Sequence, residues 1–335
     1  MDHSGSRIRI GVVGVGHLGR SHARLLAANQ EVELAAVADV EPKALAAVSA
    51  AHDVPGFADY RDLVGKVDAV SIVVPTRLHA EVASHFLARE VDVFVEKPIT
   101  PTLAEGERLV ALAAKHGRVL QVGHVERFNA VLAAIAAKGL RPRYIESQRV
   151  APFTFRSTDI GVVLDLMIHD LDLVLWWMGG SVKSVDAFGG SVFTPAEDMA
   201  SAILKFDHGG VAHLTASRVA MKAARKMRLF AADGYASLDF QQAQGVLIRK
   251  QPGWEFGALD LGSIEKGQDL WKLVYEGLLQ VEQYKLDSGN PLDAELRSFL
   301  AAVRERSRPV VSGEDACAAV AIAERVLAAM RDCRW

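Results

Sequence analysis

A glycine-rich turn near the start of the chain constrains the fold more than any other sequence feature. The apolar run 8–13 is followed by Gly14, Gly16 and Gly19 in the spacing GxGxxG, and a helix-like run begins directly after it. In a strand–turn–helix unit the first glycine permits the tight turn and the second leaves the backbone open to a pyrophosphate. The third lets the helix pack closely on the strand, and the helix N-terminus offers N–H groups to phosphates. The sequence therefore predicts a dinucleotide-binding turn.

An acidic residue at the end of the second predicted strand indicates which dinucleotide binds. Asp39 follows Gly19 at about the distance typical of the ribose-binding acid. A carboxylate there accepts hydrogen bonds from a ribose 2′-hydroxyl and repels a 2′-phosphate. The pattern predicts NAD rather than NADP as the cofactor. A chance glycine triplet is the alternative, but the strand, the helix and the acid all favour the functional interpretation.

The alternation of strands and helices changes along the chain. The first part alternates continuous apolar strands with helices, which is typical of a parallel sheet covered on both faces. One long helix near 162–178 and several short strands joined by turn signals follow. We predict an α/β fold with an N-terminal Rossmann domain at 1–123. A C-terminal α/β domain at 124–335 is expected to carry a large, mostly antiparallel, open-faced sheet.

Composition argues against several classes of protein. The chain has 335 residues, half of them hydrophobic, which is enough for two domains. A net charge of −3 without a long basic block makes nucleic acid or a membrane an unexpected partner. Cys317 and Cys333 lack CxxC spacing, so a reducing, cytoplasmic compartment fits. We expect no secretion signal, and the most apolar later stretch carries too many charges to span a membrane.

Polar residues follow three of the predicted parallel strands. Ligands of such sheets bind beyond the carboxyl edge, so these side chains are expected to face one crevice. The residues singled out at these strand ends are Pro75, Thr76 and His79, then Glu96 and Lys97, and finally Arg127 and Asn129. The Lys97 amine, at a strand end before a proline, is a candidate general acid or base, and Glu96 is a candidate partner for a ribose or carboxamide. A solvated surface pair is the alternative.

The long helix near 162–178 carries a second constellation. Asp165, His169 and Asp172 lie at i, i+4 and i+7 and share one face of a helix that is otherwise apolar nearly all round. Buried acids and histidines need partners or a chemical role. A satisfied core histidine is one alternative and a metal site another. Only two or three candidate ligands are present and none is a cysteine, so we predict no metal.

Three motifs together resemble the Gfo/Idh/MocA oxidoreductases over nearly the whole chain. They are the Gly14–Gly19 turn, Glu96-Lys97-Pro98, and Asp165 four residues before His169. The resemblance implies that Lys97, Asp165 and His169 flank the nicotinamide and that the Lys97-Pro98 bond is cis. It also implies a homodimer or homotetramer formed through the C-terminal sheet.

Two stretches resemble a narrower subgroup, the UDP-N-acetylglucosamine 3-dehydrogenases. They are residues 123–129 and 165–172. The common family pattern has a glycine where this chain has Met167. The subgroup departs from the family pattern at the same position. The resemblance implies oxidation of the 3-hydroxyl of UDP-N-acetylglucosamine or a related nucleotide sugar. A dehydrogenase of a free sugar, polyol or inositol is the alternative, and a non-catalytic NAD-responsive regulator is an alternative of another class.

These arguments define a predicted site. Lys97 or His169 takes the hydroxyl proton, and Asp165 orients His169 or holds its proton. The predicted cofactor-binding residues are Gly14, Gly16, His17, Leu18, Gly19, Asp39, Pro75, Thr76, His79, Glu96, Lys97 and Arg127. The predicted substrate-binding residues are Lys97, Arg127, Asn129, Arg156, Asp165 and His169. The candidate cations for a diphosphate are Arg127, Arg156 and the cluster Lys222, Arg225, Lys226 and Arg228, although a solvated surface is favoured for the cluster. Service to the cofactor or a structural pair is an equal alternative for Arg127.

Overall fold

The chain folds into two compact units, each assembled from separated parts of the sequence. The computed structural model describes residues 7–154, 160–252, 278–287 and 289–331. The first unit takes in residues 1–128 and 290–325, and the second takes in 129–289 and 326–335. The sequence predicts a single domain boundary, between residues 123 and 124. In the structure, most of the C-terminal helical region belongs to the first unit as well.

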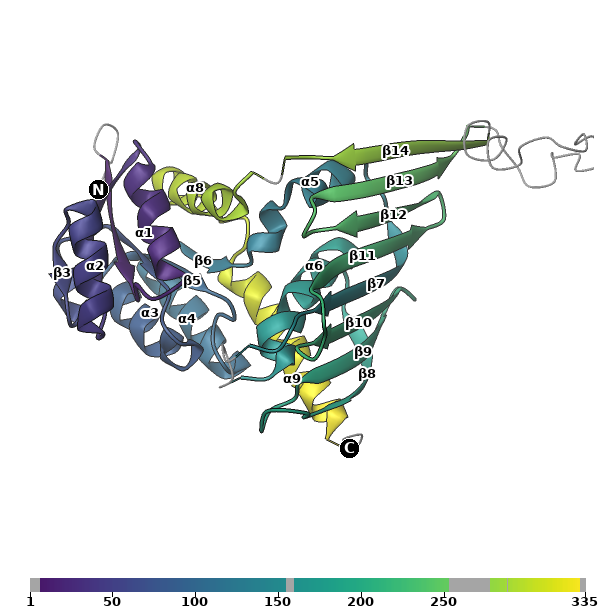
Figure 1. Cartoon of the computed structure of the whole chain (residues 1–335), viewed down its shortest axis with the longest axis horizontal. Coiled ribbons are helices and arrows are strands. Elements are labelled where there is room, and N and C mark those ends of the chain that lie inside the picture. Colours follow the sequence, from purple (N-terminus) through teal and green to yellow (C-terminus); the bar gives the residue numbers. More distant parts are fainter. Residues whose placement is uncertain (1–6, 155–159, 253–277, 288, 332–335) are drawn as a thin grey trace, which may run out of the picture. The chain divides into compact units, whose positions relative to one another are not determined.

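The first unit is built on a parallel sheet with the strand order β3-β2-β1-β4-β5-β6 (Figure 1). The strands are β1 (Ile8–Val13), β2 (Val32–Ala38), β3 (Gly56–Phe57), β4 (Ala69–Ile72), β5 (Asp92–Glu96) and β6 (Leu120–Gly123). All neighbouring pairs are parallel. This is the doubly wound order of dinucleotide-binding domains, in which the connections reverse direction between β1 and β4. A ligand crevice is expected beyond the carboxyl ends of those two strands.

Helices complete the first unit. They are α1 (Gly19–Ala28), α2 (Pro42–His52), α3 (His79–Leu87), α4 (Leu103–His116), α8 (Pro291–Glu305) and most of α9 (Gly313–Met330). Helix α8 places Leu296, Phe299 and Leu300 in the same buried cluster as Ile8 of β1, and the Phe94 and Phe299 rings lie 5.8 Å apart. This apolar contact explains why a segment from the end of the chain belongs to the first unit.

The second unit contains a large sheet with the strand order β14-β13-β12-β11-β7-β10-β9-β8. The strands are β7 (Pro142–Val150), β8 (Val182–Gly190), β9 (Met199–Phe206), β10 (Val211–Ser217), β11 (Ala224–Ala231), β12 (Gly234–Asp239), β13 (Gln244–Lys250) and β14 (Leu279–Lys285). Strands β7 and β10 pair in parallel, and the other pairs are antiparallel. Helix α5 (Ala130–Ala136) packs on β12 and β13, and α6 (Ile168–Met178) packs on β7 and β10.

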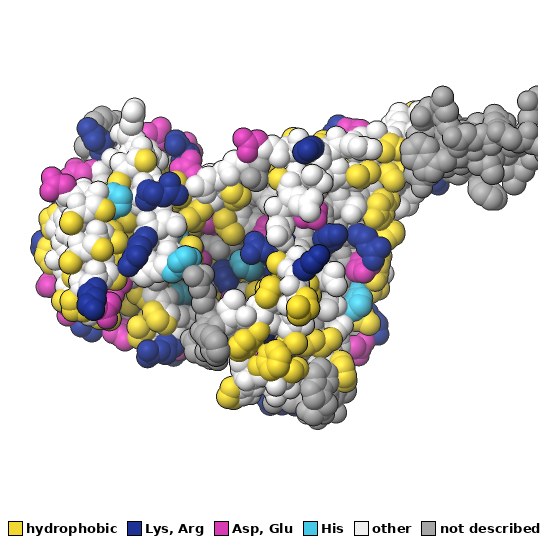
Figure 2. Space-filling model, viewed as in Figure 1, with side chains coloured by type: hydrophobic (Ala, Val, Ile, Leu, Met, Phe, Trp, Pro, Cys, Tyr) yellow, Lys and Arg dark blue, Asp and Glu magenta, His cyan; other side chains and the backbone are white. Residues whose placement is uncertain are grey.

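Alternating burial shows that one face of this sheet is open. Along β9, Ala202 and Leu204 are buried, whereas Ile203 and Lys205 are exposed. A sheet with one face on the core and one face outside is typical of antiparallel architecture. On the side drawn in Figure 2, basic and acidic side chains are interspersed and hydrophobic side chains reach the surface in several groups.

The predicted fold class is confirmed: a Rossmann domain precedes a second sheet that is mostly antiparallel. Strands β3 and β14 and the short helix α5 have no counterpart among the predicted elements. The long helix expected near 162–178 begins with a π-helical turn at Val163–Met167 before α6. Within the described part of the chain, each helix is too short or too polar to cross a lipid bilayer.

Candidate active site

The turn after β1 has the geometry that its glycines predict. Gly14 has φ +87°, and a Cβ atom there would lie 2.5 Å from the Val73 carbonyl oxygen. A Cβ at Gly19 would lie 1.8 Å from the Gly14 oxygen, so α1 begins against the turn itself. A Cβ at Gly16 would have nothing within 4 Å, so the backbone there is open to an approaching group. This geometry fits a pyrophosphate at the start of α1.

Asp39 closes the same turn. Its Oδ2 accepts the Val15 N–H at 2.7 Å, and its Oδ1 accepts the Glu41 N–H at 2.8 Å. Each carboxylate oxygen has a second acceptor site, so Asp39 can hold the turn and still accept a hydroxyl hydrogen. Sequence reasoning predicted only the second of these roles.

A cavity of about 240 Å³ lies at the carboxyl ends of the first-unit strands. Four predicted cofactor-binding residues line it, namely Gly14, Gly16, Asp39 and Pro75. Apolar side chains that include Val40, Val74 and Leu78 form much of the remaining wall. An apolar slot beside a carboxylate and an open backbone suits the adenosine part of a dinucleotide.

His79 connects two loops at this edge of the sheet. The imidazole is 1% exposed, with Nδ1 2.8 Å from the Pro98 oxygen and Nε2 2.9 Å from the Val74 oxygen. Burial lowers the pKa of His79, although the carbonyl contacts act against that shift. The ring thus ties the loop after β4 to the cis Lys97-Pro98 bond after β5. Contact of His79 with the cofactor stays a prediction.

Glu96, at the end of β5, contacts a buried histidine that sequence reasoning did not identify. His22 of α1 is 0% exposed, its Nδ1 lies 2.9 Å from the Ser71 oxygen, and its Nε2 lies 3.2 Å from Oε1 of Glu96. Burial acts to raise the pKa of Glu96, but His22 and the adjacent Lys97 outweigh it and hold that pKa below its ordinary value. Glu96 is therefore a carboxylate at neutral pH, directly beside Lys97.

The remaining first-unit candidates occupy turns at helix starts. Leu18 is the N-cap of α1 and is 43% exposed, next to His17. Thr76 begins the 3₁₀ turn Thr76–Leu78 and is nearly buried, and Arg127 lies in the 3₁₀ turn Val125–Phe128.

Asn129, a predicted substrate-binding residue, is the N-cap of α5 in the second unit. Its Oδ1 accepts the Val131 N–H at 3.2 Å, and its Nδ2 donates to the Phe240 oxygen at 3.2 Å. The side chain is 5% exposed. These contacts give Asn129 a structural role as a cap, and its contact with substrate stays a prediction. Arg156 lies outside the described residues.

The three candidates from the predicted long helix lie in two kinds of helix. Asp165 is in the π-helical turn, whereas His169 and Asp172 are in α6. Asp165 and His169 are half-buried, and Asp172 is 1% exposed. The expectation of one uniform α-helical face therefore needs correction, because a π turn widens the spacing between residues. Such turns within α-helices are frequent at functional sites.

A buried ion pair anchors α6 to the sheet beside His169. Arg149 of β7 donates from Nε to Oδ2 of Asp170 at 2.8 Å and from Nη2 to Oδ1 at 2.9 Å. The two side chains are 4% and 3% exposed. Bidentate geometry fixes the rotation of the helix about its own axis as well as its distance from the sheet. Sequence reasoning did not identify this pair, because nothing in the local pattern connects residues on a strand and a later helix.

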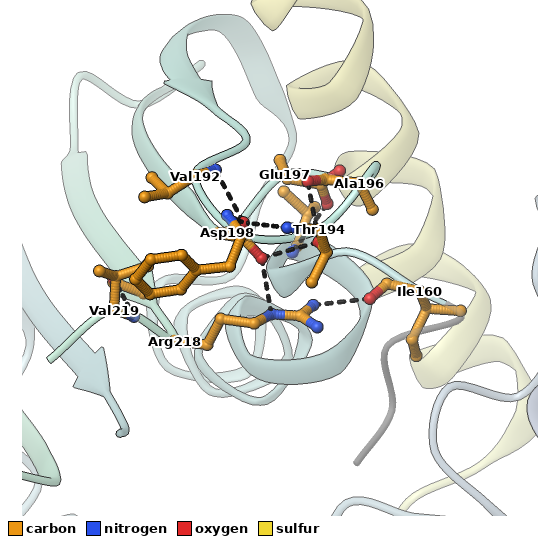
Figure 3. A network of polar contacts seen from close by, with 11 residues as sticks. Ile160, Val192, Thr194, Ala196, Glu197, Asp198, Arg218 and Val219 are labelled. Atoms are coloured by element: carbon orange, nitrogen blue, oxygen red, sulfur yellow. Dashed lines mark hydrogen bonds and ion pairs between the residues drawn. The ribbon is translucent and has the colours of Figure 1, made fainter. Parts of the chain in front are cut away.

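A second polar network holds the start of the helix (Figure 3). Glu197 accepts the Val163 N–H, and Asp198 contacts Arg218, whose Nη2 donates to the Ile160 oxygen at 2.6 Å. None of these three charged residues was a sequence candidate. Among the described residues, no group of three histidine, cysteine or acidic side chains is arranged to hold a metal ion.

The structure places the first-unit candidates at one edge of the sheet, and Asp165 and His169 on two consecutive helical segments of the second unit, whereas Asn129 caps the separate helix α5. Lys97 belongs to the first unit, whereas Asp165 and His169 belong to the second. Their convergence over a nicotinamide stays a prediction.

The fold and the glycine-rich turn define the class of protein, a dinucleotide-binding oxidoreductase. A family model described as an oxidoreductase family with an NAD-binding Rossmann fold matches residues 8–124, and the GFO/IDH/MocA C-terminal domain matches residues 134–237. The chain belongs to the Gfo/Idh/MocA family, and its cofactor is NAD.

Individual relatives have related activities. The UDP-N-acetylglucosamine 3-dehydrogenase of Acidithiobacillus ferrooxidans is 43% identical over 70% of this chain and 74% of that protein. A solved structure of that enzyme superposes with a TM-score of 0.86 at 35% identity, covering 98% of this chain and 99% of the other. The myo-inositol 2-dehydrogenase of Thermotoga maritima is 27% identical over 92% of each chain.

Proposed function

We propose that this protein oxidises the 3-hydroxyl of UDP-N-acetylglucosamine, or of a closely related nucleotide sugar, with NAD. The observation that carries the proposal is the 43% identity to an enzyme named for that reaction. The 35% identity to its solved structure over nearly the full length of both chains supports it. The residues after β6 and those around His169 support the same subgroup.

The proposed reaction divides its tasks between the two units. Bound NAD supplies a hydride acceptor. The turn at Gly14–Gly19 binds its pyrophosphate, and Asp39 binds its adenosine ribose. Lys97 or His169 accepts the proton of the sugar hydroxyl while the hydrogen on the same carbon leaves as hydride, so a ketone forms. Asp165 orients the His169 imidazole.

We further propose that Arg127 and Arg156 supply the cations that bind the diphosphate of the substrate. A diphosphate needs cationic partners, and arginine provides planar, paired donors. The surface cluster near β11 is a weaker candidate, because Arg228 pairs with Glu146 at 2.6 Å and Lys226 lies 4.0 Å from Asp239.

We also propose a homodimer or homotetramer that uses the open face of the second sheet. Strand register places Phe188, Ile203 and Phe230 on that face, and each is more than a third exposed. Exposed apolar groups on one sheet face suit a contact with another copy of the chain. A reducing cytoplasmic compartment remains the proposed location, since a buried free thiol such as Cys317 is compatible with it.

Substrate profiling tests the proposal. NADH formation is followed spectrophotometrically with UDP-N-acetylglucosamine, other UDP-hexoses, free N-acetylglucosamine, glucose and myo-inositol. We expect kcat/KM for UDP-N-acetylglucosamine to exceed that for any free sugar by at least about 100-fold, because the diphosphate contacts are lost with the latter. Mass spectrometry of the product should show a loss of two hydrogens from the sugar.

The inositol relative makes a polyol dehydrogenase the second candidate. Oxidation of myo-inositol with no turnover of UDP-sugars would favour it. NADH binding without oxidation of any sugar would instead indicate a regulator.

A further inference from the structure

We propose that Glu197, supported by Asp198 and Arg218, is a positioning residue for the helical turn that carries Asp165. This inference rests on the proposed function, which gives Asp165 and His169 their catalytic roles. Glu197 contacts the main chain at the start of this turn, and its role is to fix the position from which the turn presents its side chains.

Glu197 provides acceptors for the first N–H groups of the helix. The Val163 N–H donates to Glu197 Oε1 at 3.2 Å, and the Val162 N–H donates to the Glu197 main-chain oxygen at 3.0 Å. The first N–H groups of any helix have no acceptor within the helix. Here Val162, the N-cap, gives no side-chain cap, so a carboxylate 34 residues further along the chain takes that role.

Gly161 makes this close approach possible. A Cβ atom at Gly161 would lie 1.8 Å from Oε1 of Glu197, so any other residue would displace the carboxylate. The Asp165 N–H donates to the Gly161 oxygen at 3.0 Å. The main chain of the proposed orienting acid is thus bonded to the same glycine that the Glu197 carboxylate covers.

Asp198 and Arg218 hold the loop that presents Glu197. Oδ2 of Asp198 accepts the N–H groups of Val192, Phe193 and Thr194 at 2.6 to 2.9 Å. Burial acts to raise the pKa of Asp198, but these N–H groups hold it below its ordinary value. Asp198 is therefore charged, and its Oδ1 lies 3.5 Å from Nε of Arg218.

Arg218 connects this loop to the segment just before the helix. Its main-chain N–H donates to the Asp198 oxygen at 2.9 Å, and its Nη2 donates to the Ile160 oxygen at 2.6 Å (Figure 3). Arg218 is 5% exposed, Asp198 is 0% exposed and Glu197 is 9% exposed. The start of the helix is consequently fixed by side chains from the β8–β9 loop and the end of β10, which do not belong to the helix.

The test compares three substitutions of Glu197 in the full-length protein. Glu197→Ala removes the acceptor, Glu197→Asp keeps the charge but shortens the reach, and Glu197→Gln keeps both reach and an acceptor oxygen. Glu282→Ala removes an exposed glutamate of the same unit, paired with Lys138, and serves as the control. For each variant, kcat with UDP-N-acetylglucosamine, the Kd for NADH and amide hydrogen exchange over residues 161–169 are measured.

We expect Glu197→Ala to lower kcat by about 10- to 100-fold, the range that misplacement of a catalytic group produces. The Kd for NADH should stay unchanged, and amide exchange over 161–169 should accelerate. Glu197→Gln and Glu282→Ala should stay within about threefold of the unsubstituted protein, and Glu197→Asp should fall in between.

Two results would overturn the inference. One is a Glu197→Ala protein that retains both kcat and slow exchange over 161–169. The second result matters if Glu197→Ala does not fold. In that case, equal activity of Glu197→Asp and Glu197→Gln would overturn the inference. If the unsubstituted protein oxidises no sugar, the proposed function fails, and the exchange measurement still decides whether Glu197 holds this turn.

Discussion

At the scale of single residues, the candidate site of the first unit includes a largely buried negative charge, the carboxylate of Glu96. Glu96 is ionised because His22 and Lys97 compensate for its burial. Gly123 leaves room for that carboxylate, since a Cβ there would lie 3.0 Å from it. A negative charge therefore lies at the end of β5, next to Lys97, one of the two groups that we propose for proton transfer.

The role of Lys97 can be tested by replacing it. Lys97→Ala should lower kcat by roughly 10²- to 10⁴-fold, because a positioned acid or base contributes about that much. The Kd for NADH should change little, since the glycine turn and Asp39 remain. Lys115→Ala, in the last turn of α4, is the matched control. Full turnover by Lys97→Ala would remove this amine from the mechanism.

Cys317 predicts a pH dependence of stability. Burial, with smaller contributions from Glu107 and Glu314, raises the pKa of the folded thiol from 9.0 to about 11. Between these values the unfolded chain releases the thiol proton while the folded chain keeps it. The free energy of unfolding should therefore fall as the pH rises, by at most about 1.4 kcal/mol per pH unit from this group.

Urea unfolding of the wild type and of Cys317→Ala, from about pH 8 to about pH 11, measures this contribution. As the pH rises over this range, the wild type should lose stability relative to Cys317→Ala. A constant difference would show that the thiol titrates alike in both states.

At the scale of elements, charged side chains position α6 and the π-helical turn before it at two places. Glu197 and its partners fix the π-helical turn, and the Arg149–Asp170 pair fixes the first turn of α6 on β7. Both contacts flank His169. Apolar packing alone tolerates small rotations of a helix, whereas bidentate hydrogen bonds favour one orientation.

We expect the Arg149–Asp170 pair to affect the free energy of unfolding. Asp170→Asn should lower the free energy of unfolding by about 3 to 5 kcal/mol, because it leaves a buried guanidinium without its compensating charge. The double variant Arg149→Met/Asp170→Leu should recover much of that loss, since it removes both charges. Denaturant unfolding of the single and double variants tests this. A double variant as unstable as Asp170→Asn would contradict the charge explanation.

At the scale of the whole molecule, the open face of the second sheet distinguishes this chain from a fully covered α/β protein. Ser201 and His213 hydrogen-bond across this face, and Glu146 pairs with Arg228 on it. Tyr144, Phe230 and Tyr235 form an aromatic group beside them. A face that combines aromatic groups with already paired polar groups suits burial against a second copy.

Oligomerisation through this face can be tested with charge. The double variant Ile203→Lys/Phe230→Glu should shift the protein toward monomer in sedimentation equilibrium, because it places unpaired charges in an apolar contact. Arg61→Glu, on the surface of the first unit, is the control. An unchanged mass for the double variant would place the interface elsewhere.

The predictable part of the fold follows from local patterns. The glycine spacing identifies the turn after β1, and continuous apolar runs identify the buried parallel strands, because both depend on neighbouring residues. The cap of α9 (Gly313–Met330) is a local contact of the same kind, because the Asp315 N–H donates to the Ser312 Oγ at 3.3 Å. Strand β3 has only two residues, and that is too short to produce a periodic pattern.

The sequence by itself determined the dinucleotide-binding turn, the acid that favours NAD and the family, since these are encoded in short, contiguous motifs. Only the tertiary structure decided that α8 joins the first unit, that His22 compensates Glu96, and that Glu197 and Arg149 hold the helix bearing His169. Those contacts join residues far apart along the chain. Their formation depends on which buried charges meet when the sheets and helices pack, and no local pattern records that.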